Sequence, residues 1–158
     1  HNMQQTINAG IGLSCGLVVM GDLGPKQGVR KFGILGDPVN LASRLESLTR
    51  YFSTEIIITK DFLSTTHKLP LATRRLGDYR VKGRQEVVSL YALGRPDDPR
   101  FESSIVTLWE NWLSVVEKNS TIENFPPQLK MFQKDFETLS KWHKLGFLNQ
   151  GIWSLEEK

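Results

Sequence analysis

The stretch that decides the fold reads Gly36-Asp37-Pro38-Val39-Asn40-Leu41-Ala42-Ser43-Arg44-Leu45-Glu46. Asp37 is a favourable helix N-cap, and Pro38 suits the first helical turn, where its missing N–H has no partner to lose. The apolar residues that follow recur at the spacing of one buried helix face: Leu41, Leu45, Leu48 and Phe52. We therefore predict a helix that begins after Asp37, with Asn40 and Arg44 projecting together beside the buried face.

Strand-like segments lie on both sides of this helix. Rich in β-branched and aromatic residues, they cover residues 5–20 (one strand, or two joined at Gly16), 30–35, 55–59, 72–82 and 86–93. Turn-forming residues 21–25 separate the first two segments, and Lys82-Gly83-Arg84 joins the last pair. Residues 60–67 suggest one or two helical turns. Helices mixed with strands predict an α+β fold.

Composition changes near Gly94-Arg95-Pro96-Asp97-Asp98-Pro99, which has the residues of a linker. All four tryptophans follow it, whereas 11 of the 13 glycines lie in residues 1–99. Beyond it, apolar spacing predicts a helix over residues 101–118, with Trp109 and Trp112 in the core, and a second after Pro126-Pro127. These two helices are expected either to pair as an αα-hairpin or to lie on the sheet of the first part.

The overall composition is that of a globular protein, with 39% hydrophobic residues. Cys15 is the single cysteine, which excludes an internal disulfide, and we expect it to be a small buried apolar residue rather than a redox switch. No run of residues predicts a transmembrane helix or a signal peptide, so a cytoplasmic setting is the simplest interpretation of this portion.

The charge distribution suits a small polyanion. The formal net charge is +3, and residues 1–99 contain 13 basic and 9 acidic side chains. A mild basic excess favours a ligand such as a nucleotide. A basic nucleic-acid-binding domain is a weaker hypothesis, because the chain has neither a long Lys/Arg run nor an RNP-like aromatic motif.

Three side chains are candidates for phosphate chemistry. Arg44 offers a guanidinium fork and Asn40 an amide, both able to donate to phosphate or ribose oxygens. Lys82 lies at the tight turn that ends a predicted strand and offers a mobile point charge for a terminal phosphate. Four further cations near it are expected to raise the local potential: Arg74, Arg75, Arg80 and Arg84. Taken singly, a solvated helix face and an ordinary turn lysine would account for the same residues.

Together and in this order, these segments resemble the class III nucleotidyl cyclases. The family's second half has a G-I-x-x-x-G-x-V-x-x-G-x-x-G stretch, which Gly10 to Gly24 follows here. Its G-D-x-V-N-x-A-x-R-L-E phrase is unbroken from Gly36 to Glu46, and its V-K-G turn is Val81-Lys82-Gly83. The resemblance covers about residues 7–93.

The resemblance implies a fold and a division of the chain. The fold is the second half of a ferredoxin-like α/β sandwich, followed by two C-terminal helices. The implied parts are residues 4–94 for the cyclase half, 95–100 for the linker and 101–158 for a helical extension. The missing first β-α-β part would leave an unpaired strand edge and an uncovered sheet face, which strand exchange, dimerisation or the tail helices would cover.

The resemblance also implies an activity. Such a lyase converts a nucleoside triphosphate, ATP or GTP with ATP favoured, into the 3′,5′-cyclic nucleotide and pyrophosphate for intracellular signalling. Asn40 would orient the ribose, Arg44 would stabilise charge in the transition state, and Lys82 would bind the β- and γ-phosphates. Family enzymes are dimers, so a homodimer or a complementary cyclase half is the expected partner.

Two features depart from the family pattern. The family's metal carboxylates lie in an F-x-D-[IVM]-x-x-F-[ST] stretch that this sequence lacks, so Mg²⁺ or Mn²⁺ would be held by a first half outside it. We therefore expect a C-terminal fragment that is inactive alone, whose parent reaches a membrane only through upstream segments. The position that helps to choose the purine is Gly33, which has no side chain to contact the base. The alternative hypothesis is a catalytically dead half-domain that binds a nucleotide or a partner.

Overall fold

The computed structural model describes residues 9–25, 27–66, 71–82 and 84–155. The predicted start of the cyclase half at residues 4–8, the turn glycine Gly83 and the end of the extension at 156–158 lie outside the described residues. No helix in the described part is both long enough and apolar enough to cross a membrane.

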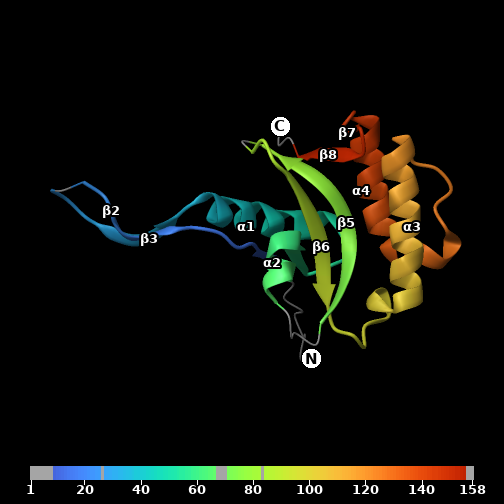
Figure 1. The fold of residues 1–158 in the computed structure, drawn as a ribbon, viewed down its shortest axis with the longest axis horizontal. Coiled ribbons are helices and arrows are strands. Elements are labelled where there is room, and N and C mark those ends of the chain that lie inside the picture. The colour runs from blue at the N-terminus through green and yellow to red at the C-terminus, as the bar shows by residue number, and fades with distance from the viewer. Residues whose placement is uncertain (1–8, 26, 67–70, 83, 156–158) are drawn as a thin grey trace, which may run out of the picture.

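The structure is an α+β fold with a six-stranded sheet and a separate two-stranded ribbon (Figure 1). The sheet order is β1-β4-β6-β5-β8-β7, and the ribbon consists of β2 and β3. The strands are β1 (Ile11–Leu13), β2 (Val19–Leu23), β3 (Lys31–Leu35), β4 (Ile56–Thr59), β5 (Ala72–Val81), β6 (Val87–Gly94), β7 (Leu148–Asn149) and β8 (Ile152–Leu155). The α-helices are α1 (Asp37–Leu48), α2 (Lys60–Thr65), α3 (Ser103–Asn119) and α4 (Gln133–Lys144), and short 3-10 helices cover Thr49–Tyr51, Pro99–Phe101 and Pro127–Phe132.

Helix α1 is the crossover between the parallel strands β1 and β4. It buries the predicted face, with Leu41, Leu45, Leu48 and Phe52 all at most 8% exposed. Gly12 of β1 lies directly under the helix, because a Cβ there would be 2.0 Å from the Ala42 carbonyl oxygen. A glycine in β1 therefore allows the strand and the helix to pack backbone against backbone.

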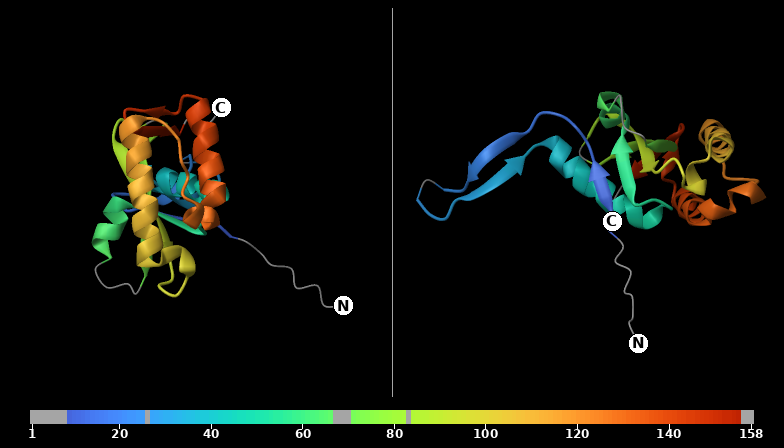
Figure 2. Two further views of the ribbon diagram at one scale, coloured as in Figure 1. Left: turned by 90° about the vertical axis from the view of Figure 1, so that its right-hand side faces the viewer. Right: turned by 90° about the horizontal axis from the view of Figure 1, so that it is seen from below.

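The β2–β3 ribbon, which we call the arm, projects away from the body between β1 and α1 (Figures 1 and 2). Its strands pair antiparallel from Val19 with Leu35 to Leu23 with Lys31. Most large apolar side chains of the arm and of the two residues that precede β2 are exposed: Leu17, Val18, Val19, Met20, Val29, Phe32, Ile34 and Leu35. The arm therefore presents to solvent the kind of surface that proteins usually bury.

The C-terminal extension completes the sheet and its core. Strand β8 pairs in parallel with the end of β5, from Tyr79 with Trp153 to Val81 with Leu155. Helices α3 and α4 lie side by side (Figures 1 and 2), with the rings of Trp112 and Phe136 6.0 Å apart. Both helices contribute buried side chains to the same apolar cluster as α1, β5 and β6.

Several sequence-based expectations are confirmed, including the α1 stripe, the β5–β6 pair and buried Trp109 and Trp112. The capping prediction was wrong by one residue, because Gly36 is the N-cap of α1 and Asp37 is already helical. The first turn was also misplaced, since β2 continues to Leu23 and the reversal follows it. The expected burial of Cys15 was wrong, because this side chain is exposed at the base of the arm. Neither β7 nor β8 was predicted.

Candidate functional site

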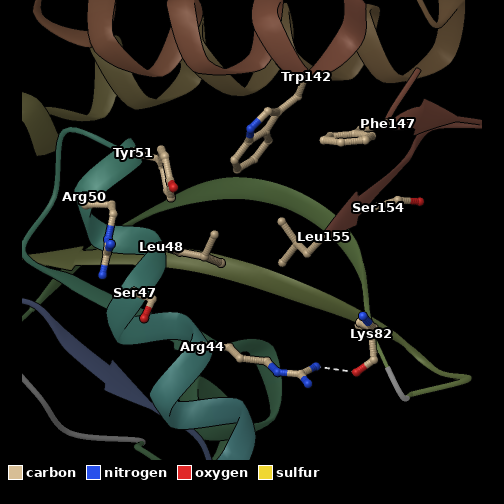
Figure 3. A pocket seen from close by; sticks show the side chains of 10 residues that line it. All are labelled: Arg44, Ser47, Leu48, Arg50, Tyr51, Lys82, Trp142, Phe147, Ser154 and Leu155. Atoms are coloured by element: carbon tan, nitrogen blue, oxygen red, sulfur yellow. Dashed lines mark hydrogen bonds between the residues drawn. The ribbon is translucent and has the colours of Figure 1, made fainter. Parts of the chain in front are cut away.

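The structure brings Arg44 and Lys82 together across 38 residues of sequence. Helix α1 carries Arg44 beside its buried leucines, and Lys82 follows directly on the last residue of β5. The Arg44 Nη1 atom donates a hydrogen bond to the Lys82 carbonyl oxygen (Figure 3). Two of the three candidate side chains therefore share one location.

A pocket of about 460 Å³ opens beside this contact (Figure 3). Arg44 and Lys82 lie together at one end, whereas Tyr51, Trp142 and Phe147 present their rings at the other, with Arg50 beside Tyr51. Leu48 and Leu155 lie between the two ends. The remaining lining residues are Ser47 and Ser154.

The three cations of this pocket form no salt bridge with any acidic side chain in the described ranges. Of the four nearby arginines expected to raise the potential around Lys82, three are paired with acidic side chains, whereas Arg80 forms no salt bridge with the described residues. Arg74 pairs with Asp135, Arg75 with Glu117 and Asp78, and Arg84 with Asp37. Uncompensated positive charge is thus concentrated at the pocket, which favours an anionic ligand.

The other two candidate residues lie nearer the arm. Asn40 is exposed one helical turn before Arg44 and is not part of the pocket lining. Gly33 lies within the arm, opposite Gly21, where an added Cβ would be 2.6 Å from the Leu23 side chain. The structure therefore places Asn40 beside the cationic end and Gly33 in the packing of the arm.

The described residues contain no group of three or more His, Cys, Asp or Glu side chains that could hold a metal ion. The carboxylate of Asp37, the acidic residue at the start of α1, is 2.5 Å from the Arg84 guanidinium. This portion of the chain thus supplies cations and an amide to the site.

Sequence reasoning missed most of the pocket wall. Arg50 and Tyr51 follow α1 at helical spacing from Arg44 and Ser47, so periodicity offered a signal for them. Trp142, Phe147, Ser154 and Leu155 belong to the extension, more than 90 positions later in the chain. Only the docking of the extension onto β5 and α1 brings them to the pocket.

Comparisons with known proteins agree on one family. The family described as "Adenylate and Guanylate cyclase catalytic domain" matches residues 1–94. The chain is 37% identical over 87 residues to an adenylate cyclase of Anabaena cylindrica, covering 54% of this chain and 17% of that protein. It is 27% identical over 119 residues to the terminal-differentiation-specific adenylate cyclase of Dictyostelium discoideum, covering 72% of this chain and 6% of the relative.

Among solved structures, a bacterial light-regulated adenylyl cyclase is similar, with 28% identity and a TM-score of 0.46 over 65% of this chain and 28% of that one. The chain spans less than a fifth of the length of each of the two cyclase relatives. The match includes α1, Arg44 and Lys82. This chain belongs to the adenylate and guanylate cyclase catalytic domain family.

Proposed function

We propose that this chain is the C-terminal half of a nucleotidyl cyclase catalytic domain and supplies the phosphate-binding cations of its active site. The observation that carries the proposal is the contact between Arg44 and Lys82 beside a pocket. The cations that line this pocket form no salt bridge with an acidic side chain among the described residues. The named adenylate cyclase relatives favour ATP as the substrate and cyclic AMP as the product. In the reaction the ribose 3′-oxygen bonds to the α-phosphorus, the bond to the β-phosphate bridging oxygen breaks, and pyrophosphate leaves as the hydroxyl proton passes to solvent.

The residues of this chain act electrostatically. The reaction concentrates negative charge on the α-phosphate oxygens and on the leaving pyrophosphate, and a fixed guanidinium stabilises such charge as it develops. Arg44 is already oriented by its bond to the Lys82 carbonyl, so little reorganisation is needed on binding. Lys82 binds the terminal phosphates, and Asn40, one turn from Arg44, hydrogen-bonds the ribose.

The proposed reaction uses Mg²⁺ or Mn²⁺, which activates the hydroxyl and neutralises phosphate charge when bound. The described residues around Arg44 and Lys82 do not form a site for it, because they contribute no cluster of carboxylates. We therefore assign the metal ligands to a complementary cyclase half, and we expect this chain to be inactive alone.

The exposed apolar arm is the surface proposed to receive that partner. Phe32 is 69% exposed and Leu17 is 96% exposed, although both are large apolar residues. Packing the arm against a second cyclase half or a second copy would bury these side chains. The arm leads directly into α1, so a partner held there would face Asn40 and Arg44.

Complementation tests the proposal. The chain is mixed with a class III first half that carries the F-x-D motif, and cyclic AMP is measured with ATP and Mn²⁺. We expect activity only in the mixture. Arg44→Ala should lower kcat by about a hundredfold or more, the scale for losing one transition-state-stabilising group. Lys82→Ala should mainly raise KM, and Lys118→Gln, at an exposed site on α3, serves as the control.

The alternative function is a half-domain that binds a nucleotide or partner without turnover. Under that alternative the mixture would bind ATP with no cyclic nucleotide formed. Activity of this chain alone would instead contradict the assignment of the metal ligands to another segment.

A further inference from the structure

We propose that the pocket between α1 and the C-terminal extension is a binding site for a small aromatic anion, distinct in its aromatic half from the phosphate-binding residues. The chemical class is a planar ring that carries a phosphate or carboxylate group. Binding itself does not depend on cyclase activity. Its consequence, competition with the triphosphate for Arg44 and Lys82, rests on the function proposed above.

The two ends of the pocket define this ligand class. At one end Arg44 offers a planar guanidinium group and Lys82 an ammonium group, both suited to phosphate or carboxylate oxygens. Tyr51, Trp142 and Phe147 present rings at the opposite end (Figure 3). A volume of about 460 Å³ is within the usual range of small-molecule pockets. Inorganic phosphate would contact only the cationic end.

The aromatic end is held in place by packing. The Trp142 ring packs edge-on against Phe52 at 5.9 Å and Tyr79 at 6.5 Å, and tilts against Tyr51 at 5.8 Å. Tyr51 and Phe52 belong to or directly follow the 3-10 helix after α1, and Tyr79 belongs to β5. The Trp142 ring is therefore held between the segment that follows α1 and the strand that leads to Lys82. Such fixed rings can contact a planar ligand without a large loss of side-chain entropy.

Phe147 is anchored through its backbone. The Phe147 N–H donates to the Trp142 carbonyl at 3.0 Å, and its carbonyl accepts from the Ser154 N–H at 2.7 Å. Strand β8, which contains Ser154, is in turn paired with β5 just before Lys82. The extension thus forms a preorganised wall facing the cations.

The shared cations give this site its regulatory consequence. Arg44 and Lys82 line the pocket and are also the proposed phosphate-binding side chains of the cyclase. A bound aromatic anion would occupy these groups and exclude the triphosphate. The pocket would therefore inhibit the cyclase competitively, through a wall that the C-terminal extension contributes.

Isothermal titration calorimetry on this chain tests the binding with 1-naphthyl phosphate as the probe. Inorganic phosphate and 1-naphthol serve as half-probes. We expect the complete probe to bind at least about tenfold more tightly than either half-probe, since it contacts both ends. Equal affinity for naphthyl phosphate and inorganic phosphate would overturn the proposal.

Two variants locate the probe in the pocket. Arg50→Gln removes a cation that lines the pocket beside Tyr51 and should weaken the binding of naphthyl phosphate by about three- to tenfold. Phe147→Ala should weaken the binding of naphthyl phosphate and leave the binding of inorganic phosphate unchanged. Lys118→Gln, which also removes one cation, should have no effect. Arg50 is exposed, so its substitution is not expected to disturb folding. Unchanged binding in Arg50→Gln would place the probe elsewhere and refute the site.

The outcomes separate this inference from the proposed function. Calorimetry uses no second cyclase half, so absent binding would remove the aromatic-anion site and leave the complementation result intact. Binding without complementation would remove the cyclase proposal and keep the site.

Discussion

Arg74 and Asp135 form a buried ion pair that joins the sheet to the extension. The Arg74 Nη2 atom donates to Asp135 Oδ1 at 2.8 Å, and both side chains are fully buried. The Arg74 guanidinium carbon also lies 4.5 Å from the centre of the Trp109 ring and 3.8 Å from that of Phe132. Burial lowers the pKa of Arg74, and the Asp135 charge opposes that shift. Removing either partner would therefore leave the other charge buried without its counter-charge.

Asp135→Asn should destabilise the fold by about 3–5 kcal/mol, because it leaves a buried guanidinium without its counter-charge. Urea denaturation followed by circular dichroism measures the loss. Glu137→Gln, two residues later and exposed, is the control and should change the free energy of unfolding little. A loss below about 1 kcal/mol in Asp135→Asn would show that the pair is not needed for docking the extension.

Tyr79 provides a prediction in alkaline solution. Burial raises its pKa well above 10, and its hydroxyl donates to the Leu76 carbonyl at 3.0 Å. Above pH 10 the unfolded chain loses this proton while the folded chain keeps it, so stability falls as pH rises. Tyr79→Phe should remove up to about 1.4 kcal/mol of that loss per pH unit. Parallel profiles of stability against pH for the wild-type chain and Tyr79→Phe would contradict this role of Tyr79.

At the scale of elements, the β1–α1–β4 unit is where sequence was most informative. The leucine stripe predicted α1 because burial of a helix face repeats every three to four residues. The same spacing could not show that Gly12 touches the α1 backbone, because that contact depends on how strand and helix pack. Strands β7 and β8 are too short to produce a periodic signal, and β8 forms by pairing with β5.

Gly12→Ala should destabilise the protein by about 2 kcal/mol or more, because the new methyl group would collide with the α1 backbone at Ala42 and Glu46. Gly21→Ala, in the arm, is the matched control, since an added Cβ there has no neighbour within 4 Å among the described residues. Thermal unfolding of the two variants gives the comparison. Similar melting temperatures would mean that β1 and α1 can separate without cost.

For the whole molecule, the arm and the extension have opposite roles. The extension buries its apolar side chains in the common core, whereas the arm leaves its own exposed. The two candidate partners of the arm, a second copy or a complementary half, both require an intermolecular contact. Measuring self-association in solution therefore tests whether the arm packs against a second copy of the chain.

Light scattering should show that this chain is not monomeric. The double substitution Phe32→Ser and Ile34→Ser should shift the measured mass toward that of the monomer. The physical reason is the loss of apolar area that the arm would bury against another chain. Val115→Ser on α3 also removes an exposed apolar side chain and should leave the mass unchanged. A monomeric wild-type chain would contradict self-association through the arm.

The sequence by itself determined the helix with its buried stripe, the β5–β6 pair and the three candidate side chains Asn40, Arg44 and Lys82, because each depends on local spacing or on a family motif. The tertiary structure alone decided which cations remain unpaired, where Gly33 lies and that the extension walls the pocket. Those outcomes depend on contacts between segments tens of residues apart, such as Arg74 with Asp135 and Arg44 with Lys82. Packing of the common core sets such contacts, and local sequence patterns do not encode them.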